Sequence, residues 1–174
     1  MILSIISAIG NNNEIGKANT LLWDLPADMK HFRETTSGHP IVMGQRTFES
    51  LGISADGTAG RPLPKRRNII LTLDKEFKRE GVEIAYSLDE LNELLKTTTE
   101  KDEEVFIIGG GQIYKLFIDK ADRLYITHVE VSFPDADTYF PDIDMTKWNK
   151  VKSTSYPKDE LNKYNLEFVI YERK

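Results

Sequence analysis

The chain has 174 residues, of which 40% are hydrophobic and 29% charged, so it is long enough to bury one core and short enough for one domain. A net charge of -5 and a pI near 5.3 argue against a nucleic-acid or anionic-membrane surface, because both need clustered Lys and Arg. With no cysteine and three scattered histidines, disulfides and thiolate metal sites are excluded, and we expect no metal.

The first third of the chain reads as strand, loop, helix and strand. Ile2–Ile9 is apolar on both faces, which is typical of a central strand covered on both sides, and residues 41–43 form a second such strand. Pro26 suits the first position of a helix, because its φ is already helical and its missing N–H needs no partner there. We predict a helix from Pro26 that ends before Gly38, preceded by a long loop over residues 14–22.

The middle of the chain alternates between short apolar segments and helical patterns. We predict strands over residues 68–72, 82–85, 105–108 and 123–129, and helices over residues 47–51, 87–95 and 112–118. Ser87 and Glu90 have the spacing of a capping box at the start of one of these helices. An acidic loop over residues 133–138 then breaks the alternation.

The C-terminal part has no helical pattern. Residues 148–156 and 165–172 alternate apolar with polar residues, which predicts an antiparallel pair at one edge of the sheet. The fold class is therefore α/β, with a single domain over residues 1–174. Its mainly parallel central sheet of about eight strands is flanked by about four helices and ends in a C-terminal antiparallel hairpin.

Residues 53–60 are small and polar, without an apolar period, and Arg61-Pro62-Leu63-Pro64 follows them with prolines that favour extended structure. We interpret residues 53–60 as an exposed surface loop with no catalytic part. No apolar run approaches the roughly 20 residues of a membrane span, and the first residues lack a cationic lead-in. We therefore expect a cytoplasmic location.

Asp28 is a lone carboxylate on the side of the predicted helix that also carries Met29 and Phe32. In the simpler interpretation, an acid in the first turn offsets the positive end of the helix dipole. In the other, Asp28 is a pocket acid. The second is favoured by its context: Trp23 just before the helix, the apolar strand upstream and a triple glycine downstream.

Two predicted strands run into glycine and then directly into a helix, at Gly44 and at 109–111. In a doubly wound sheet, ligands bind at the carboxyl ends of the strands. Such junctions expose backbone N–H groups at a positive helix end, where a phosphate can approach with no Cβ in the way. Two junctions point to a diphosphate. Neither matches the dinucleotide fingerprint or the P-loop, and each alone is better explained as a tight strand-to-helix turn.

Packing explains most of the other candidates. The aromatic ones are interpreted as core residues: Phe32, Tyr114, Phe117 and Trp148. Thr127 lies in a predicted strand, where β-branching accounts for it. The histidines have no Ser or Cys arranged for a triad and are interpreted as surface or strand residues: His31, His39 and His128. The residues alone therefore indicate a nucleotide-like site beside one buried acid.

Six motifs then occur in one order along the chain. They are Leu22-Trp23-Asp24-Leu25-Pro26-Ala27-Asp28, Ile41-Val42-Met43-Gly44, Arg61-Pro62-Leu63-Pro64, Asn68-Ile69-Ile70-Leu71, Ile107-Ile108-Gly109-Gly110-Gly111 with Tyr114, and Asp137-Thr138-Tyr139-Phe140-Pro141. In this order, and over most of its length, the chain resembles dihydrofolate reductase. The resemblance implies an NADPH-dependent oxidoreductase of one-carbon metabolism and tetrahydrofolate biosynthesis, and an antifolate target. It would reduce 7,8-dihydrofolate by hydride transfer from nicotinamide C4 to pterin C6, with a proton reaching N5.

The resemblance also implies which residues bind the substrate. The catalytic residues implied by the resemblance are Asp28, Trp23, Leu22 and Thr127. Asp28 would accept hydrogen bonds from the 2-amino group and the N3 side of the pterin, and Thr127 would support it directly or through water. The proton would reach N5 through water. The walls of the pterin and benzoyl pocket would be Ile6, Ala8, Met29, Phe32, Leu51, Leu63, Ile108 and Tyr114. Arg66 would grip the glutamate α-carboxylate, with Arg61 as a second candidate.

The cofactor site is implied in the same way. NADPH would contact Ala8, Ile15, Gly16, Asn19, Gly44, Gln45, Arg46, Thr47, Leu71, Thr72, Gly109, Gly110, Gly111, Gln112, Ile113 and Tyr114. Residues 14–22 would form a mobile lid over the nicotinamide. Three features depart from the family pattern: Leu22 where Pro is common, Gln45 where a basic residue is common, and the insertion at 53–60. The preference for NADP over NAD would therefore depend on Arg46 and Thr72.

Two alternatives remain at this point. A related pterin or pyrimidine reductase of the same fold would keep the glycines but need no acid at Asp28, and a non-catalytic nucleotide-binding module would bind without turnover. The expected partners are the small-molecule substrate dihydrofolate and antifolate inhibitors, with no nucleic acid and no membrane. We expect the chain to act as a monomer.

Overall fold

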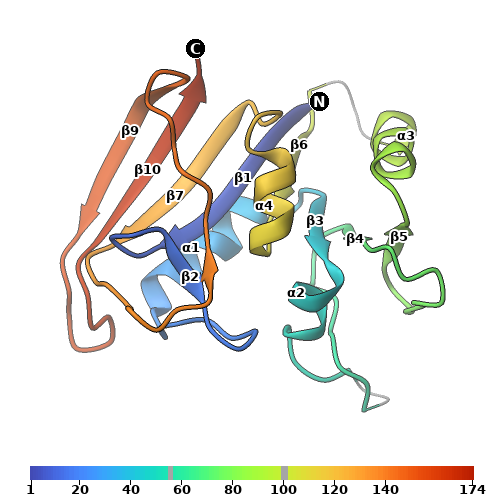
Figure 1. The fold of residues 1–174 in the computed structure, drawn as a ribbon, viewed down its shortest axis with the longest axis horizontal. Coiled ribbons are helices and arrows are strands. Elements are labelled where there is room, and N and C mark those ends of the chain that lie inside the picture. Colours follow the sequence, from blue (N-terminus) through green and yellow to red (C-terminus); the bar gives the residue numbers. More distant parts are fainter. Residues whose placement is uncertain (55–56, 99–101) are drawn as a thin grey trace.

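A computed structural model describes residues 1–54, 57–98 and 102–174, and it shows a central sheet with helices on both faces (Figure 1). The strands are β1 (Ile2–Ile9), β2 (Glu14–Gly16), β3 (Ile41–Gly44), β4 (Asn68–Leu71), β5 (Glu83–Ala85), β6 (Glu104–Ile107), β7 (Arg123–Val129), β8 (Thr138–Tyr139), β9 (Trp148–Tyr156) and β10 (Leu166–Arg173). The helices are α1 (Pro26–Thr36), α2 (Gln45–Glu49), α3 (Leu88–Thr98) and α4 (Gly111–Phe117). Within the described ranges, no helix is long and apolar enough to cross a membrane.

The main sheet has eight strands in the order β5-β4-β3-β6-β1-β7-β10-β9. Pairing is parallel from β5 to β7, whereas β10 is antiparallel to both β7 and β9, which confirms the predicted fold class and the C-terminal hairpin. Strand β6 lies between β1 and β3, although it follows both in sequence. The carboxyl ends of β1, β3 and β6 therefore meet at a topological switch point, the usual place for a ligand in such sheets.

Hydrophobic clusters fill both faces of the sheet. On one face, α3 and α4 pack over a cluster that includes Phe117. On the other, Phe32 of α1 and Phe48 of α2 pack over a second cluster. Neighbouring residues of β1 point to opposite faces, so Ile5 belongs to the first cluster and Ile6 to the second. This is why β1 is apolar along its whole length.

Most elements lie within a residue or two of their predicted bounds. Helix α1 begins at Pro26, and β7 and β9 have the predicted bounds. Helix α2 begins earlier than residue 47, because the extended backbone of Gly44 leads directly into it. At α3, the Glu90 N–H donates to Ser87 Oγ (3.1 Å), as the predicted capping box requires. The Glu90 side chain accepts from the Tyr86 N–H (2.7 Å) rather than from the Ser87 N–H, so this second bond of the box lies one residue earlier.

The prediction of a continuous loop over residues 14–22 is wrong at its start. Strand β2 pairs with β8, which begins at the end of the predicted acidic loop, and the two form a separate small antiparallel sheet. Strands this short show no periodicity, and each depends on a partner more than a hundred residues away. Local sequence signals could not reveal this pair.

Between α2 and β4, the segment on either side of positions 55 and 56 is held by contacts at its two ends. Ile53 is 63% exposed and forms an antiparallel bridge with Ala59, and the Gly60 N–H donates to Gly52 O (2.8 Å). Gly60 is buried with a φ of +95°, and a Cβ added there would collide with the ring of Phe48. Positions 55 and 56 lie outside the described residues. The segment is therefore anchored at its two ends.

We expect residues 54–58 to be dispensable for catalysis when the two anchored ends are kept. A variant with an Asn-Gly turn in place of residues 54–58 should keep turnover close to that of the parent, because loop closure changes by only about 0.6 kcal/mol per halving of length. Steady-state turnover and thermal unfolding would check this. A large loss of kcat in a well-folded variant would show that the segment closes the site.

Candidate active site

Helix α1 brings Asp28 to the switch point, and a distant residue caps its first turn. The N-cap residue Leu25 makes no side-chain cap, but the Ala27 N–H donates to Asn162 Oδ1 (2.9 Å). Asn162 is only 2% exposed, and Asp159 Oδ1 in turn accepts from the Asn162 N–H (2.7 Å). The loop between β9 and β10 therefore fixes the start of α1. No motif around Asn162 indicated this role.

Asp28 is half-buried in the first turn of α1. Burial raises the pKa of its carboxyl from 3.8 to about 6, and a hydrogen bond with Thr127 opposes the rise. Thr127 is 2% exposed and lies beside Ala8 in the pairing of β1 with β7. The Asp28 carboxyl therefore contacts a buried hydroxyl of β7 as well as lying in the first turn of α1.

The predicted pocket walls come together on the face covered by α1. Five of them pack in one cluster: Ile6, Phe32, Leu51, Leu63 and Ile108. Ala8 and Trp23 belong to the adjoining cluster. The Trp23 Nε1 atom is buried and has no hydrogen-bond partner among the described residues. Met29 is 37% exposed on the outer side of α1.

Tyr114 lies on the opposite face of the sheet from Asp28. It is 5% exposed within the cluster under α4, and its hydroxyl donates to Ile6 O (2.8 Å). Burial raises the pKa of this phenol far above its usual value, and the Asp28 charge adds to the rise. Tyr114 therefore bonds the backbone of Ile6, a predicted pocket wall, from the cluster under α4.

Arg66 lies against the C-terminal half of α1. Its guanidinium is 5.7 Å from the centre of the Phe32 ring, and it donates to Thr36 Oγ1 (2.9 Å) and Pro64 O (2.7 Å). The side chain is therefore held in one orientation next to a pocket wall. Arg61 is exposed.

The two glycine junctions lie against each other. The Gly44 N–H donates to Gly109 O (2.8 Å), and a Cβ added to Gly110 would lie 3.1 Å from Thr47 Oγ1. Gly44 and Gly110 are the N-caps of α2 and α4, and neither helix has a side-chain cap or an acid in its first turn. Two uncapped helix ends with no Cβ between them fit a diphosphate.

The side chains around the two glycine junctions differ in whether their polar atoms already form hydrogen bonds within the protein. Thr72 is 8% exposed, and its hydroxyl donates to Gln45 Oε1 (2.6 Å), while Gln45 Nε2 donates to Glu49 (3.0 Å). Arg46 is exposed, and within the described residues its guanidinium has no hydrogen bond or ion pair. Leu71 is buried, and Gln112 is exposed.

The predicted lid lies beside both junctions. Ile15 is 8% exposed, and its Cδ1 lies 3.8 Å from a Cβ built on Gly111. Asn19 Nδ2 donates to Arg46 O (3.1 Å) at the start of α2. The lid is also joined to the loop after β7 by contacts that sequence reasoning missed: an ion pair of Lys17 with Asp135 and a bond from the Ala18 N–H to Asp137 Oδ2 (2.8 Å).

A switch point that brings a carboxylate close to two uncapped glycine junctions is typical of nucleotide-dependent α/β enzymes. The family model for dihydrofolate reductase matches residues 2–173, and the chain belongs to the dihydrofolate reductase family. This confirms the resemblance seen in the motifs.

Individual dihydrofolate reductases are similar to this chain in sequence and in structure. The chain is 43% identical to dihydrofolate reductase type 3 of Salmonella typhimurium over 173 residues, which cover 99% of each chain. It is 40% identical to dihydrofolate reductase of Bacillus subtilis over 172 residues, 99% of this chain and 95% of that one. The structure of dihydrofolate reductase from Enterococcus faecalis complexed with NADP(H) and RAB-propyl superposes with a TM-score of 0.86 at 35% identity, covering 99% of this chain and 96% of that chain.

Proposed function

We propose that the site at the switch point reduces 7,8-dihydrofolate to 5,6,7,8-tetrahydrofolate with NADPH, and that Asp28 binds the pterin there. As a member of the dihydrofolate reductase family, the chain is an NADPH-dependent oxidoreductase. The observation that carries the residue assignment is the hydrogen bond between the Asp28 carboxyl and Thr127, which is 2% exposed and lies beside Ala8; burial raises the pKa of this carboxyl to about 6.

Asp28 would act by position and by charge. A carboxylate can accept two parallel hydrogen bonds, from the 2-amino group and from the N3 side of the pterin, which fixes the ring next to the nicotinamide. Its negative charge favours a protonated pterin. From that place it cannot touch N5, so water would deliver the proton. The hydrogen bond with Thr127 would hold the carboxylate in orientation.

NADPH, when bound, supplies the hydride from nicotinamide C4. The uncapped ends of α2 and α4 would hold its diphosphate, and Ile15 would lie on the nicotinamide side. Because the Thr72 hydroxyl is already bonded to Gln45, the exposed guanidinium of Arg46, which has no partner among the described residues, is the better candidate for the 2′-phosphate. Arg46 would therefore carry most of the cofactor preference.

Arg46→Ala should weaken NADPH binding by about 10- to 100-fold and change NADH binding little, because only NADPH carries the 2′-phosphate that a charge-assisted bond would hold. Dissociation constants for both cofactors would be measured on the same preparations. Lys158→Ala, which removes an exposed positive charge between β9 and β10, is the matched control and should leave their ratio unchanged. Equal losses for both cofactors in Arg46→Ala would show that Arg46 contacts the shared diphosphate or nothing.

The function is tested by mixing the protein with NADPH and dihydrofolate and following the loss of NADPH absorbance. We expect turnover, with tetrahydrofolate as the product. Binding of both ligands without turnover would indicate a non-catalytic module, and turnover of a different pterin or pyrimidine alone would indicate a related reductase. Antifolates are expected to compete with dihydrofolate for the Asp28 pocket.

The same proposal includes a single domain over residues 1–174, a monomer and a cytoplasmic location. The family match over residues 2–173 supports one domain. Strand β9 ends the main sheet, and its exposed Lys150 and Lys152 support a monomer, because lysines on an edge strand oppose pairing with a second chain. Sedimentation at assay concentration would detect a dimer.

A further inference from the structure

Glu14 is a buried carboxylate at the base of the lid. Its side chain is 1% exposed, although a charged group is costly to bury without compensation. Oε2 accepts from the Asn12 N–H (2.7 Å), and Oε1 accepts from the Phe133 N–H (2.9 Å) and from Asn12 Nδ2 (3.1 Å). Burial alone would raise the pKa of this carboxyl, but these hydrogen bonds outweigh it and hold the pKa below its usual value. Glu14 is therefore ionised at neutral pH.

The carboxylate joins three segments, which backbone bonds from the Gly10 N–H to Glu14 O (2.9 Å) and from the Asn11 N–H to Val131 O (2.8 Å) also connect. Asn12 belongs to the turn after β1, Glu14 begins β2, and Phe133 lies in the loop after β7. Gly10 is in contact too, since a Cβ built there would lie 2.6 Å from Glu14 Oε2. In the part of the chain that the structure describes, N–H donors rather than a cation hold the charge. Its hydrogen bonds therefore fix how the lid base meets the sheet.

Glu14 is connected to the candidate active site in two ways. Along the chain, β2 carries Ile15, which lies against the Gly111 junction on the cofactor side. Across the loop, the ring of Phe133 packs against Trp23, with 5.8 Å between ring centres. One buried carboxylate is thus connected to Ile15 on the proposed cofactor side and, through Phe133, to Trp23 on the proposed substrate side.

We propose that Glu14 is a positioning residue for hydride transfer, which holds Ile15 and, through Phe133, Trp23 at the separation that the two ligands need. This rests on the proposed function. Glu14 touches neither ligand; it acts through the residues that do. Since a misplacement of about 1 Å can cost about 100-fold in rate, loss of these bonds should slow the chemical step more than it weakens binding.

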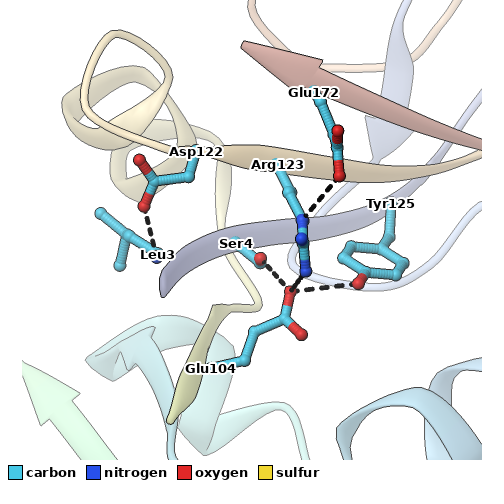
Figure 2. A network of polar contacts seen from close by, with 7 residues as sticks. All are labelled: Leu3, Ser4, Glu104, Asp122, Arg123, Tyr125 and Glu172. Carbon is cyan, nitrogen blue, oxygen red and sulfur yellow. Dashed lines mark hydrogen bonds and ion pairs between the residues drawn. The ribbon is translucent and has the colours of Figure 1, made fainter. Parts of the chain in front are cut away.

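Figure 2 shows the matched control, Glu104, and its polar contacts. Glu104 pairs with Ile2 at the start of β1, whereas Glu14 follows the end of that strand. The Glu104 carboxylate is also largely buried, with 15% of the side chain exposed, and Oε1 accepts from Ser4 Oγ and Tyr125 Oη (3.0 Å) and lies 3.7 Å from Arg123 Nη1. It joins β1, β6 and β7 at their start, far along the strands from the lid. Its loss should lower stability without displacing either ligand.

The experiment compares Glu14→Leu, Glu14→Gln, Glu104→Leu and Glu104→Gln. Single-turnover hydride transfer is measured after mixing the enzyme–NADPH complex with dihydrofolate, along with kcat, KM and thermal unfolding. We expect a loss of about 100-fold in hydride transfer for Glu14→Leu and about 10-fold for Glu14→Gln, whose amide oxygen can still accept from Phe133, with kcat falling more than KM rises. Both Glu104 variants should keep the parent rate.

Three results would overturn the proposal: a folded Glu14→Leu with the parent rate, a rate loss in Glu104→Leu as large as in Glu14→Leu, or a change in KM alone. If Glu14→Leu does not fold, Glu14→Gln decides by the same criteria. Phe133→Leu gives a further check. If the effect of Glu14 passes through Phe133, adding Glu14→Leu should slow hydride transfer by a smaller factor in the Phe133→Leu variant than in the parent. A parent protein that binds but does not reduce dihydrofolate would instead refute the proposed function.

Discussion

Asp28→Asn is expected to lower turnover at pH 7 by about 10²- to 10⁴-fold, the usual value of general acid-base assistance, with NADPH binding little changed. The amide keeps the shape and most of the hydrogen-bonding capacity of the carboxylate but removes the charge that favours a protonated pterin. Hydride transfer and the NADPH dissociation constant would be measured together. Asp24→Asn, at an exposed acid just before the helix, is the control and should keep the parent rate.

The pH dependence separates the charge of Asp28 from its position. In the parent, the rate should decline as pH rises, because protonated pterin becomes scarce. In Asp28→Asn, acid should recover part of the loss, since solvent can then protonate N5 beforehand. A variant that folds well and keeps near-parent activity at pH 7 would restore the helix-end interpretation of Asp28.

The same substitution is expected to stabilise the fold at neutral pH. The carboxyl pKa is about 6 when folded and 3.8 as its ordinary value, so between these the folded state binds more protons and the free energy of unfolding falls as pH rises. Above pH 6, the ionised Asp28 carboxylate lowers the free energy of unfolding by up to about 3 kcal/mol. The loss is smaller where solvent screens the partly exposed side chain. Asp28→Asn lacks this cost. Its advantage should appear in denaturant unfolding at pH 8 and disappear below about pH 4.

Gly110→Ala is expected to weaken NADPH binding by about 10- to 100-fold, because its Cβ would enter the gap between the ends of α2 and α4 and displace one or more charge-assisted bonds to the diphosphate. The Cβ would lie 3.1 Å from Thr47 Oγ1, and Gly110 has an extended backbone with a φ of -84° that alanine adopts. Stability should change little. Titration of NADPH and thermal unfolding of the free protein would show the two effects separately.

Gly109→Ala is the matched comparison. Gly109 has a φ of +120°, and a Cβ there would point at Tyr114, 3.1 Å from its hydroxyl oxygen. Backbone strain of this kind costs about 1–3 kcal/mol, so Gly109→Ala should lower the free energy of unfolding. If Gly110→Ala binds NADPH as tightly as the parent, the diphosphate does not lie between the two junctions.

The sequence by itself determined the elements whose signals are local. The apolar strands β1 and β7, the start of α1 at Pro26 and the cap at Ser87 depend on periodicity, a fixed φ and a short-range hydrogen bond, all of which lie within a few neighbouring residues. The glycine junctions were also visible, because glycine directly between a strand and a helix is itself a local signal. The order of such motifs sufficed to predict the family.

Tertiary structure alone decided the contacts between segments far apart in the chain. Asn162 caps α1 from the hairpin loop, β2 finds its partner in β8, and the buried Glu14 reaches Phe133, each across more than a hundred residues. Tyr114 points to the face away from Asp28, and the Thr72 hydroxyl is taken by Gln45. Sequence patterns show which residues are apolar or polar, but buried polar groups select their partners only when packing brings the segments together.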